Sequence, residues 1–163
     1  MAGSTTKKVL VRRFDGQAVT GYAAPQTYLR PDGIEILNRD GQLLVIPYKE
    51  LKAVYFVRDF DVPATAEEKK VFQSRPKLEG LWVRMRFRDD DLLEGILPND
   101  LLQVTDLGVT VTPPDPYSNN QKIFVPRPAL RELTVLGVIG SPIHKPRAKR
   151  LVPAKEQIAL FEE

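Results

Sequence analysis

The sequence predicts an all-β protein in which two small, strongly bent barrels follow one another along the chain. Fourteen prolines and ten glycines among 163 residues indicate many turns and short elements instead of long helices. Two stretches, residues 9–56 and 82–136, resemble each other in the order of their apolar runs, glycines and prolines. Each stretch divides into five short strands in hairpin order, which favours a small barrel.

The internal similarity rests on glycines and on prolines that follow an apolar run. The differences in length between the two stretches fall in turns, where a repeated unit tolerates them. The matched pairs are Phe14 with Phe87, Gly21 with Gly95, Gly33 with Gly108, Pro47 with Pro126, and Leu51 with Leu130.

Each stretch opens with an alternating strand and a tight hairpin. Residues 81–87 alternate apolar side chains with Trp or Arg, which is the period of a half-buried strand. Asp15-Gly16 and the three aspartates at 89–91 are expected to form the hairpin turns that follow. We therefore interpret the aspartates as a charged turn, with a metal-binding loop as the alternative.

A second hairpin follows in each stretch. Asp40-Gly41, between apolar runs at 34–37 and 43–46, is a strong signal for a two-stranded turn. The corresponding loop of the second stretch is longer, at residues 113–121, and contains Asn119 and Asn120. These two asparagines predict side chain-to-backbone bonds of a turn, with a ligand contact as the alternative.

Pro47 and Pro126 are expected to end a strand, because proline cannot donate a hydrogen bond to a sheet. One helical turn and a last strand, at residues 52–57 and 132–137, complete each stretch. Between the stretches, Thr65 and Glu68 form a capping box that predicts a short helix over residues 65–72. We accordingly expect a first barrel at 7–60, a linker with a short helix at 61–80, a second barrel at 81–140 and a flexible tail at 141–163.

The composition argues against an enzyme. The absence of cysteine excludes disulfides, thiolate nucleophiles and thiolate-bound zinc. The single histidine, His144, lies in the Pro-rich tail, away from any predicted rigid scaffold. Since no nucleophile is paired with a base, we expect no catalytic activity, no metal and no cofactor.

Targeting signals are not apparent in the sequence. No run of about 18 apolar residues is present, so no membrane-spanning helix is expected. The N-terminal residues lead directly into a strand-like segment without an apolar signal region, which favours a cytoplasmic protein.

The net charge of +3 is concentrated in the tail, where residues 141–163 carry five Lys or Arg and three Glu. The body is therefore close to neutral, which does not by itself favour nucleic-acid binding. Its arginines are interpreted as a solvated strand face, with a phosphate-contacting ridge as the alternative. They are Arg12, Arg13, Arg84, Arg86 and Arg88. The tail residues that could contact phosphates are Lys145, Arg147, Lys149 and Arg150.

The strand, glycine and hairpin pattern resembles the Sm-like or SH3-like small barrel, seen twice, at residues 8–57 and 81–137. Sm-like proteins bind RNA, so this resemblance implies a nucleic-acid-binding module. The phrases at 74–89, 118–126 and 136–140 also resemble an uncharacterised bacterial family with no assigned activity.

The last residues of the sequence carry the most specific motif. Gln157, Ile158, Leu160 and Phe161 resemble the Gln-Leu-x-Leu-Phe peptide by which bacterial replication and repair proteins dock on the sliding DNA clamp. The resemblance implies that Gln157 fills one subsite and that Leu160 and Phe161 fill a hydrophobic pocket. The alternative is an amphipathic tail that packs against the body or extends one of its sheets.

These observations predict a non-enzymatic adaptor, an accessory factor of DNA replication or repair that binds the sliding clamp through residues 157–161. One rival is an Sm-like RNA-binding module in which the basic tail contacts phosphates. The other is a structural protein whose tail packs on its own barrels. None of these three interpretations involves a membrane.

Overall fold

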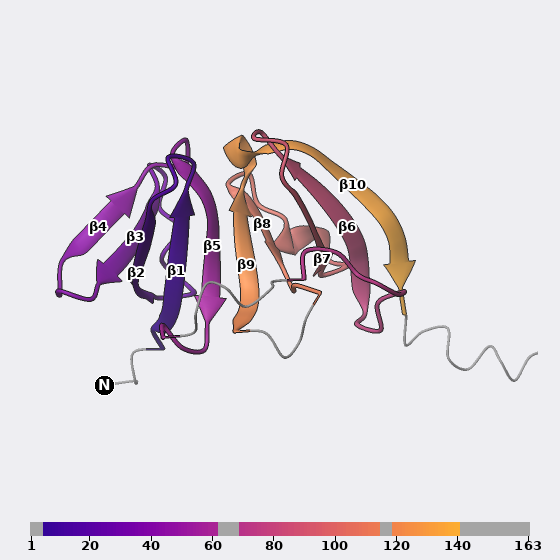
Figure 1. Ribbon diagram of the computed structural model, residues 1–163, viewed down its shortest axis with the longest axis horizontal. Coiled ribbons are helices and arrows are strands. Elements are labelled where there is room, and N and C mark those ends of the chain that lie inside the picture. The colour runs from indigo at the N-terminus through magenta and orange to yellow at the C-terminus, as the bar shows by residue number, and fades with distance from the viewer. Residues whose placement is uncertain (1–4, 62–68, 115–118, 141–163) are drawn as a thin grey trace, which may run out of the picture.

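The prediction of an all-β protein is confirmed by a computed structural model, which describes residues 5–61, 69–114 and 119–140 (Figure 1). Its regular elements are ten β-strands and two single turns of 3-10 helix. No α-helix occurs within these ranges, and none of the described segments could cross a membrane as a helix.

The first half of the chain contributes five strands, each short and bounded by turn residues. The β1–β2 and β3–β4 hairpins turn at Gly16 and Gly41, which both have φ of +87°, a conformation that glycine adopts without strain. The strands are β1 Lys7–Arg13, β2 Ala18–Ala23, β3 Ile34–Asn38, β4 Leu43–Ile46 and β5 Leu51–Val57.

The second half contributes five more strands. The predicted helical turn before the last strand is present as the 3-10 turn η2, Arg127–Ala129, and a further 3-10 turn, η1 Leu101–Gln103, precedes β8. The strands are β6 Gly80–Phe87, β7 Leu92–Leu97, β8 Gly108–Val111, β9 Asn120–Pro126 and β10 Leu130–Ile139.

The strands form two open antiparallel sheets. Seven strands lie in the order β4-β3-β2-β1-β5-β9-β8, and three lie in the order β10-β6-β7. A two-residue bridge links the sheets, because Ile96 on β7 and Thr112 after β8 exchange two backbone hydrogen bonds of 2.9 Å. The strands therefore follow one another along a curved arc with β4 at one end and β10 at the other (Figure 1).

Two separate closed barrels are not observed. Closure of the first half would require its last strand, β5, to pair with β4, but the free edge of β5 is paired with β9 instead. This pairing occupies the edge of β9 that β10 would need, so the second half also stays open. The predicted helix at 65–72 falls mostly outside the described residues, and its described part, residues 69–72, is not helical.

The two halves nevertheless share detailed features of register. Gly21 lies opposite Val9, and Gly95 lies opposite Val83, at the same step of the first hairpin. The pairing of β5 with β1 and that of β10 with β6 contain equivalent bulges, at residues 51–53 and 130–132, and the β10–β6 pairing has a second one at residues 135–137.

Gly33 and Gly108 are required for the same reason. A Cβ atom at either position would lie 2.3 Å from a backbone oxygen of the paired strand, that of Ile46 or Val125. Both glycines therefore allow a close backbone approach just before a proline, Pro47 or Pro126.

The match of Phe14 with Phe87 is wrong by one residue. In the first hairpin the Arg13 amide donates to the carbonyl of Gln17, and in the equivalent hairpin the Phe87 amide donates to that of Asp91. Arg13 and Phe87 are thus the equivalent positions, and Asp90, with φ of +69°, takes the place of Gly16. Phe87 is buried, whereas Phe14 packs at the margin of the same apolar cluster.

The core consists of two apolar clusters that meet at β5. Val54 and Phe56 face the cluster of the first half, and Ala53, Tyr55 and Val57 face the cluster of the second. Strand β5 is consequently buried on both faces, which explains its nearly continuous apolar sequence.

Candidate functional site

The residues assigned to partner binding from sequence lie outside the described residues. These are the proposed clamp-binding residues Gln157, Ile158, Leu160 and Phe161, and the basic tail residues Lys145, Arg147, Lys149 and Arg150. The candidate site that the described residues do form lies at the joint between the two halves.

The joint is an antiparallel pairing of β5 with β9. Val54 lies opposite Phe124, and Phe56 lies opposite Lys122. Phe124 belongs to the second half but packs in the core of the first, where its ring meets that of Tyr28 edge to face at 5.9 Å. Tyr28 makes a second edge-to-face contact with Phe56 at 5.5 Å.

A pocket of about 580 Å³ opens beside these aromatic rings. Part of its lining is apolar and consists of Tyr28, Phe56, Pro25 and Pro98. Its polar groups are those of Lys7, Thr110, Gln121 and Lys122. The pocket thus draws side chains from both halves of the chain.

The electrostatic character of the pocket is positive. Lys7 and Lys122 line it together with no carboxylate. Lys122 Nζ donates to Thr112 Oγ1 at 2.8 Å, and neither lysine forms an ion pair with a described acidic residue. Two lysines and several apolar side chains in the lining of one pocket suit a ligand with an anionic group attached to an apolar body.

The phenol of Tyr28 stays protonated in this setting. Burial raises its pKa well above the usual range, and its hydrogen bond with Thr110 opposes the shift only in part. Tyr28 therefore supplies a neutral hydroxyl instead of a general base near neutral pH. This neutral hydroxyl lies beside the apolar rings of the lining, a combination that suits ligand binding.

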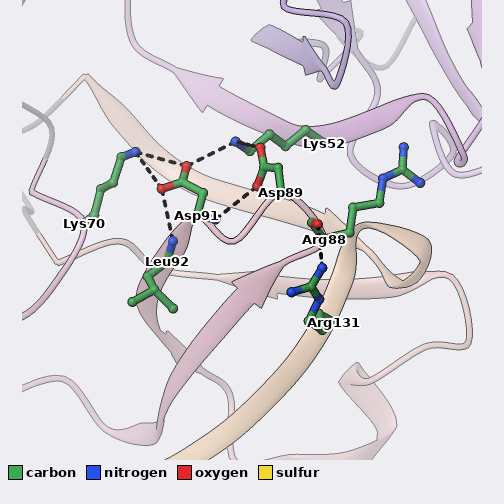
Figure 2. A network of polar contacts seen from close by, with 7 residues as sticks. All are labelled: Lys52, Lys70, Arg88, Asp89, Asp91, Leu92 and Arg131. Carbon is green, nitrogen blue, oxygen red and sulfur yellow. Dashed lines mark hydrogen bonds and ion pairs between the residues drawn. The ribbon is translucent and has the colours of Figure 1, made fainter.

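A polar network, drawn in Figure 2, provides a second link between the halves through residues that do not line the pocket. Lys52 on β5 donates to Asp89 at 2.7 Å and to Asp91 at 3.1 Å, both in the turn between β6 and β7. Lys70 also donates to Asp91 at 3.1 Å. Arg131 pairs with Asp90 on the far side of the turn.

The three aspartates therefore form a charged turn, as predicted. Burial alone would raise the pKa values of Asp89 and Asp91, but hydrogen bonds from Lys52, and from Lys70 to Asp91, lower both below the usual range. Burial would lower the pKa of Lys52, and the same bonds raise it. Protein ammonium groups already occupy the carboxylates, and no cluster of three metal-ligating side chains occurs among the described residues.

Four of the five arginines considered as a phosphate ridge contact acidic or aromatic neighbours. Arg13 pairs with Glu50 and Asp15, and Arg84 pairs with Glu94. The Arg88 guanidinium lies 3.8 Å from the ring centre of Phe14, and that of Arg12 lies 5.4 Å from Tyr55. These contacts to acidic and aromatic neighbours hold the arginines within the fold.

Asn119 makes the side chain-to-backbone bonds that its sequence context predicts. Its Oδ1 accepts from the amides of Arg58 and Asp59, and its Nδ2 donates to the Asp59 carbonyl at 2.7 Å. Asn120, in contrast, is the first residue of β9, so the predicted loop ends two residues earlier than expected.

Glu94 on β7 was not identified from sequence, although it is one of two buried polar residues among those described. Its carboxylate accepts from Arg84 at 2.9 Å, from Trp82 Nε1 at 3.0 Å and from the Phe72 amide at 3.1 Å. Burial alone would raise the pKa of Glu94, but these hydrogen bonds lower it below the usual range. The sequence did contain a signal for this buried carboxylate: a single Glu in an apolar strand, between two leucines and Gly95.

Lys7 and Lys122 were also missed, because their proximity depends on the pairing of β5 with β9, which joins residues far apart in sequence.

Comparison with known proteins adds no chemistry to this site. No match to the chain was found among curated proteins or among solved structures. A family model does match residues 5–137, and the chain therefore belongs to the family of unknown function DUF6982.

Proposed function

We propose that the chain is a non-enzymatic adaptor that docks on the bacterial sliding DNA clamp through residues 157–161, as an accessory factor of replication or repair. The observation that carries this proposal is the Gln-Ile-Ala-Leu-Phe motif near the C-terminal end of the sequence. The family match ends at residue 137, so the motif lies outside the part of the chain that defines the family.

The position at which the chain leaves the sheet supports this role. Strand β10 ends at Ile139, at the end of the arc opposite β4 (Figure 1). Residues 140–156 then separate the sheet from Gln157, and they include three prolines and five basic side chains. A linker of this composition disfavours regular structure and allows the peptide to reach a partner without displacing a strand.

Replacing Leu160 and Phe161 together with alanine is expected to weaken clamp binding more than a hundredfold. Each side chain contributes about 1.5–3 kcal/mol when it is transferred from water into an apolar pocket. Titration calorimetry of the full chain into a purified clamp measures the change, starting from a dissociation constant near micromolar for a peptide of this size.

The matched control replaces Leu151 and Val152, two apolar tail residues outside the motif, with alanine. This control is expected to bind as the wild type does, and the melting temperatures of all three proteins should agree. The proposal fails if the wild type shows no heat of binding, or if both double variants bind equally well.

The body is interpreted as two small-barrel units of Sm-like or SH3-like type, fused through their edges. The shared order of strands and the equivalent bulges favour this interpretation over an unrelated all-β arrangement. A nucleic-acid-binding function is the second candidate, and the pocket at the joint favours it, because Lys7 and Lys122 are available to a phosphate.

The Lys7→Ala, Lys122→Ala double variant is expected to lower affinity for a single-stranded RNA about tenfold. It should also reduce the salt dependence of binding by roughly one charge per lysine, because each lost phosphate contact releases fewer counterions. Fluorescence anisotropy at several salt concentrations measures both quantities. Lys49 and Lys77, which lie outside the pocket, provide the control pair; equal losses in both pairs would contradict a role for the pocket.

A further inference from the structure

The joint between the two halves has an unused counterpart at the ends of the molecule. The joint pairs β5, the last strand of the first half, with β9, the fourth strand of the second. The corresponding strands are β10, the last of the second half, and β4, the fourth of the first. Both of these lie at a sheet edge, at opposite ends of the arc (Figure 1).

The register of each half identifies the counterpart residues. Val54 pairs with Val11 directly after the bulge at residues 51–53, and Leu133 pairs with Met85 directly after the equivalent bulge at residues 130–132. Leu133 and Val135 on β10 are therefore the counterparts of Val54 and Phe56. On the other side of the joint, Ile46 and Val125 each precede the strand-ending proline. Val45 and Leu43 on β4 consequently correspond to Phe124 and Lys122.

Burial separates the occupied joint from its counterparts. Val54 and Phe124, which face each other across the joint, are 0% and 1% exposed. Their counterparts Leu133 and Val45 are 37% and 49% exposed. Val135 and Leu43, one pair further along, are 50% and 68% exposed. Three buried apolar side chains of the joint, Val54, Phe56 and Phe124, are thus matched by Leu133, Val135 and Val45, which are open to water, whereas Lys122, the counterpart of Leu43, is itself exposed.

The exposed row on β10 is continuous with the core. Leu133 lies opposite Met85 and Val135 lies opposite Val83, and both partners on β6 are fully buried. Side chains of directly opposed residues share one face of a sheet, so the row extends the buried face of β6 to an uncovered edge. In the first half the same extension is covered by Phe124 of the neighbouring strand.

The outer backbone edge of β10 also lacks the usual protection against pairing with another chain. It is the longest strand, with ten residues, and no other described strand pairs with its outer edge. Proteins commonly protect such an edge with proline, lysine or a short strand. The sequence of β10 contains neither proline nor lysine, and its two charged residues, Arg131 and Glu132, lie near its beginning.

We propose that copies of this chain associate head to tail by pairing β10 of one copy with β4 of the next, antiparallel, as β5 pairs with β9. The joint sets the register, which places Leu133 opposite Val45 and Val135 opposite Leu43. Each copy offers two different edges, so the contact is heterologous. It generates a ring if the rotation between copies closes and an open chain of copies if it does not.

A second copy fits the exposed edges better than a partner of another kind. The edge complementary to β10 is already present on this chain, and the joint shows that the two kinds of strand pair with each other. The alternatives are that residues 141–163 fold back onto β10 or that an unrelated protein binds there. No described strand pairing provides a template for either, and the experiment below distinguishes both from a second copy.

The test uses two full-length variants, each with one edge blocked by a charge. Val45→Lys blocks the β4 edge and Val135→Lys blocks the β10 edge, and both positions are exposed, so folding should be retained. Sedimentation velocity measures the mass as a function of concentration, and circular dichroism melting checks the fold. Val138→Lys, at a 55% exposed position of β10, replaces Val135→Lys if the latter melts early.

The wild type should form species larger than the 18.4 kDa of one chain as its concentration rises. Each variant alone should remain a single chain, with an apparent dissociation constant at least tenfold higher. An equimolar mixture should form a dimer and nothing larger, because only one intact β10 edge and one intact β4 edge remain in each pair.

Three results would overturn the proposal. A wild type that stays a single chain at every concentration excludes association, and slow hydrogen exchange of β10 in that single chain would identify the tail as the occupant. A variant that still dimerises alone indicates a symmetric contact between identical edges. A mixture that stays monomeric shows that β10 and β4 do not recognise each other.

Discussion

Replacing Phe124 with alanine is expected to lower the free energy of unfolding by about 3–5 kcal/mol. The ring is almost fully buried, although it belongs to a strand of the second half and packs in the core of the first. Its removal deletes the edge-to-face contact with Tyr28 and leaves a cavity beside Val54, in the pairing of β5 with β9 that joins the halves. The loss is a large fraction of the 5–15 kcal/mol that typically stabilises a domain.

Urea denaturation followed by circular dichroism measures this loss, and Val45→Ala provides the matched control. Val45 occupies the corresponding position on β4 but is 49% exposed, so its truncation should cost less than about 1 kcal/mol. Equal costs for the two substitutions would show that Phe124 does not hold the halves together.

Replacing Glu94 with alanine is expected to lower the free energy of unfolding by about 2–4 kcal/mol. The substitution leaves the Trp82 indole N–H and the Phe72 amide without the acceptor that they share, and it removes the ion-pair partner of Arg84. Glu79→Ala is a suitable control, because no hydrogen bond or ion pair joins that carboxylate to another described residue.

The pH dependence of stability provides an independent check on Glu94. Its pKa is lower in the folded protein than its ordinary value of 4.5, so the folded state favours the charged carboxylate. The resulting stabilisation is present above pH 4.5 and is lost as the pH falls through the folded pKa. The difference in stability between the wild type and Glu94→Gln should therefore shrink below pH 4.5.

Asp89 and Asp91, whose pKa values are also lowered, lose stabilisation in acid in both proteins and cancel in this comparison. Urea midpoints measured between about pH 3 and 7 give the required curves. A difference that stays constant over the range would mean that Glu94 does not contribute through its charge.

The local elements of this fold could be predicted from sequence, because they depend on neighbouring residues. Alternation over residues 81–87 marks a strand, and Asp40-Gly41 marks a hairpin through the backbone conformation that glycine permits. Pro47 and Pro126 mark strand ends, because proline lacks the N–H group that a sheet requires.

The closure of the sheets could not be predicted, because it depends on a choice between distant partners. Strand β5 could satisfy its free edge with β4 or with a strand of the second half, and no local signal distinguishes these outcomes. Because the pocket is built across the β5–β9 pairing, the proximity of Lys7 and Lys122 could not be read from the sequence either. The wrong match of Phe14 with Phe87 is a register error of one residue. Such an error is small in sequence, but it exchanges the two faces of a strand.

The central proposal is that clamp binding resides in residues 157–161 and not in the β-sheet body. Hydrogen exchange of the full chain, measured with and without a saturating sliding clamp, tests it most directly. We expect slower exchange on binding in peptides that contain Leu160 and Phe161, with no change in β1–β10. Slower exchange in the strands around the pocket, with the terminal peptide unaffected, would contradict it.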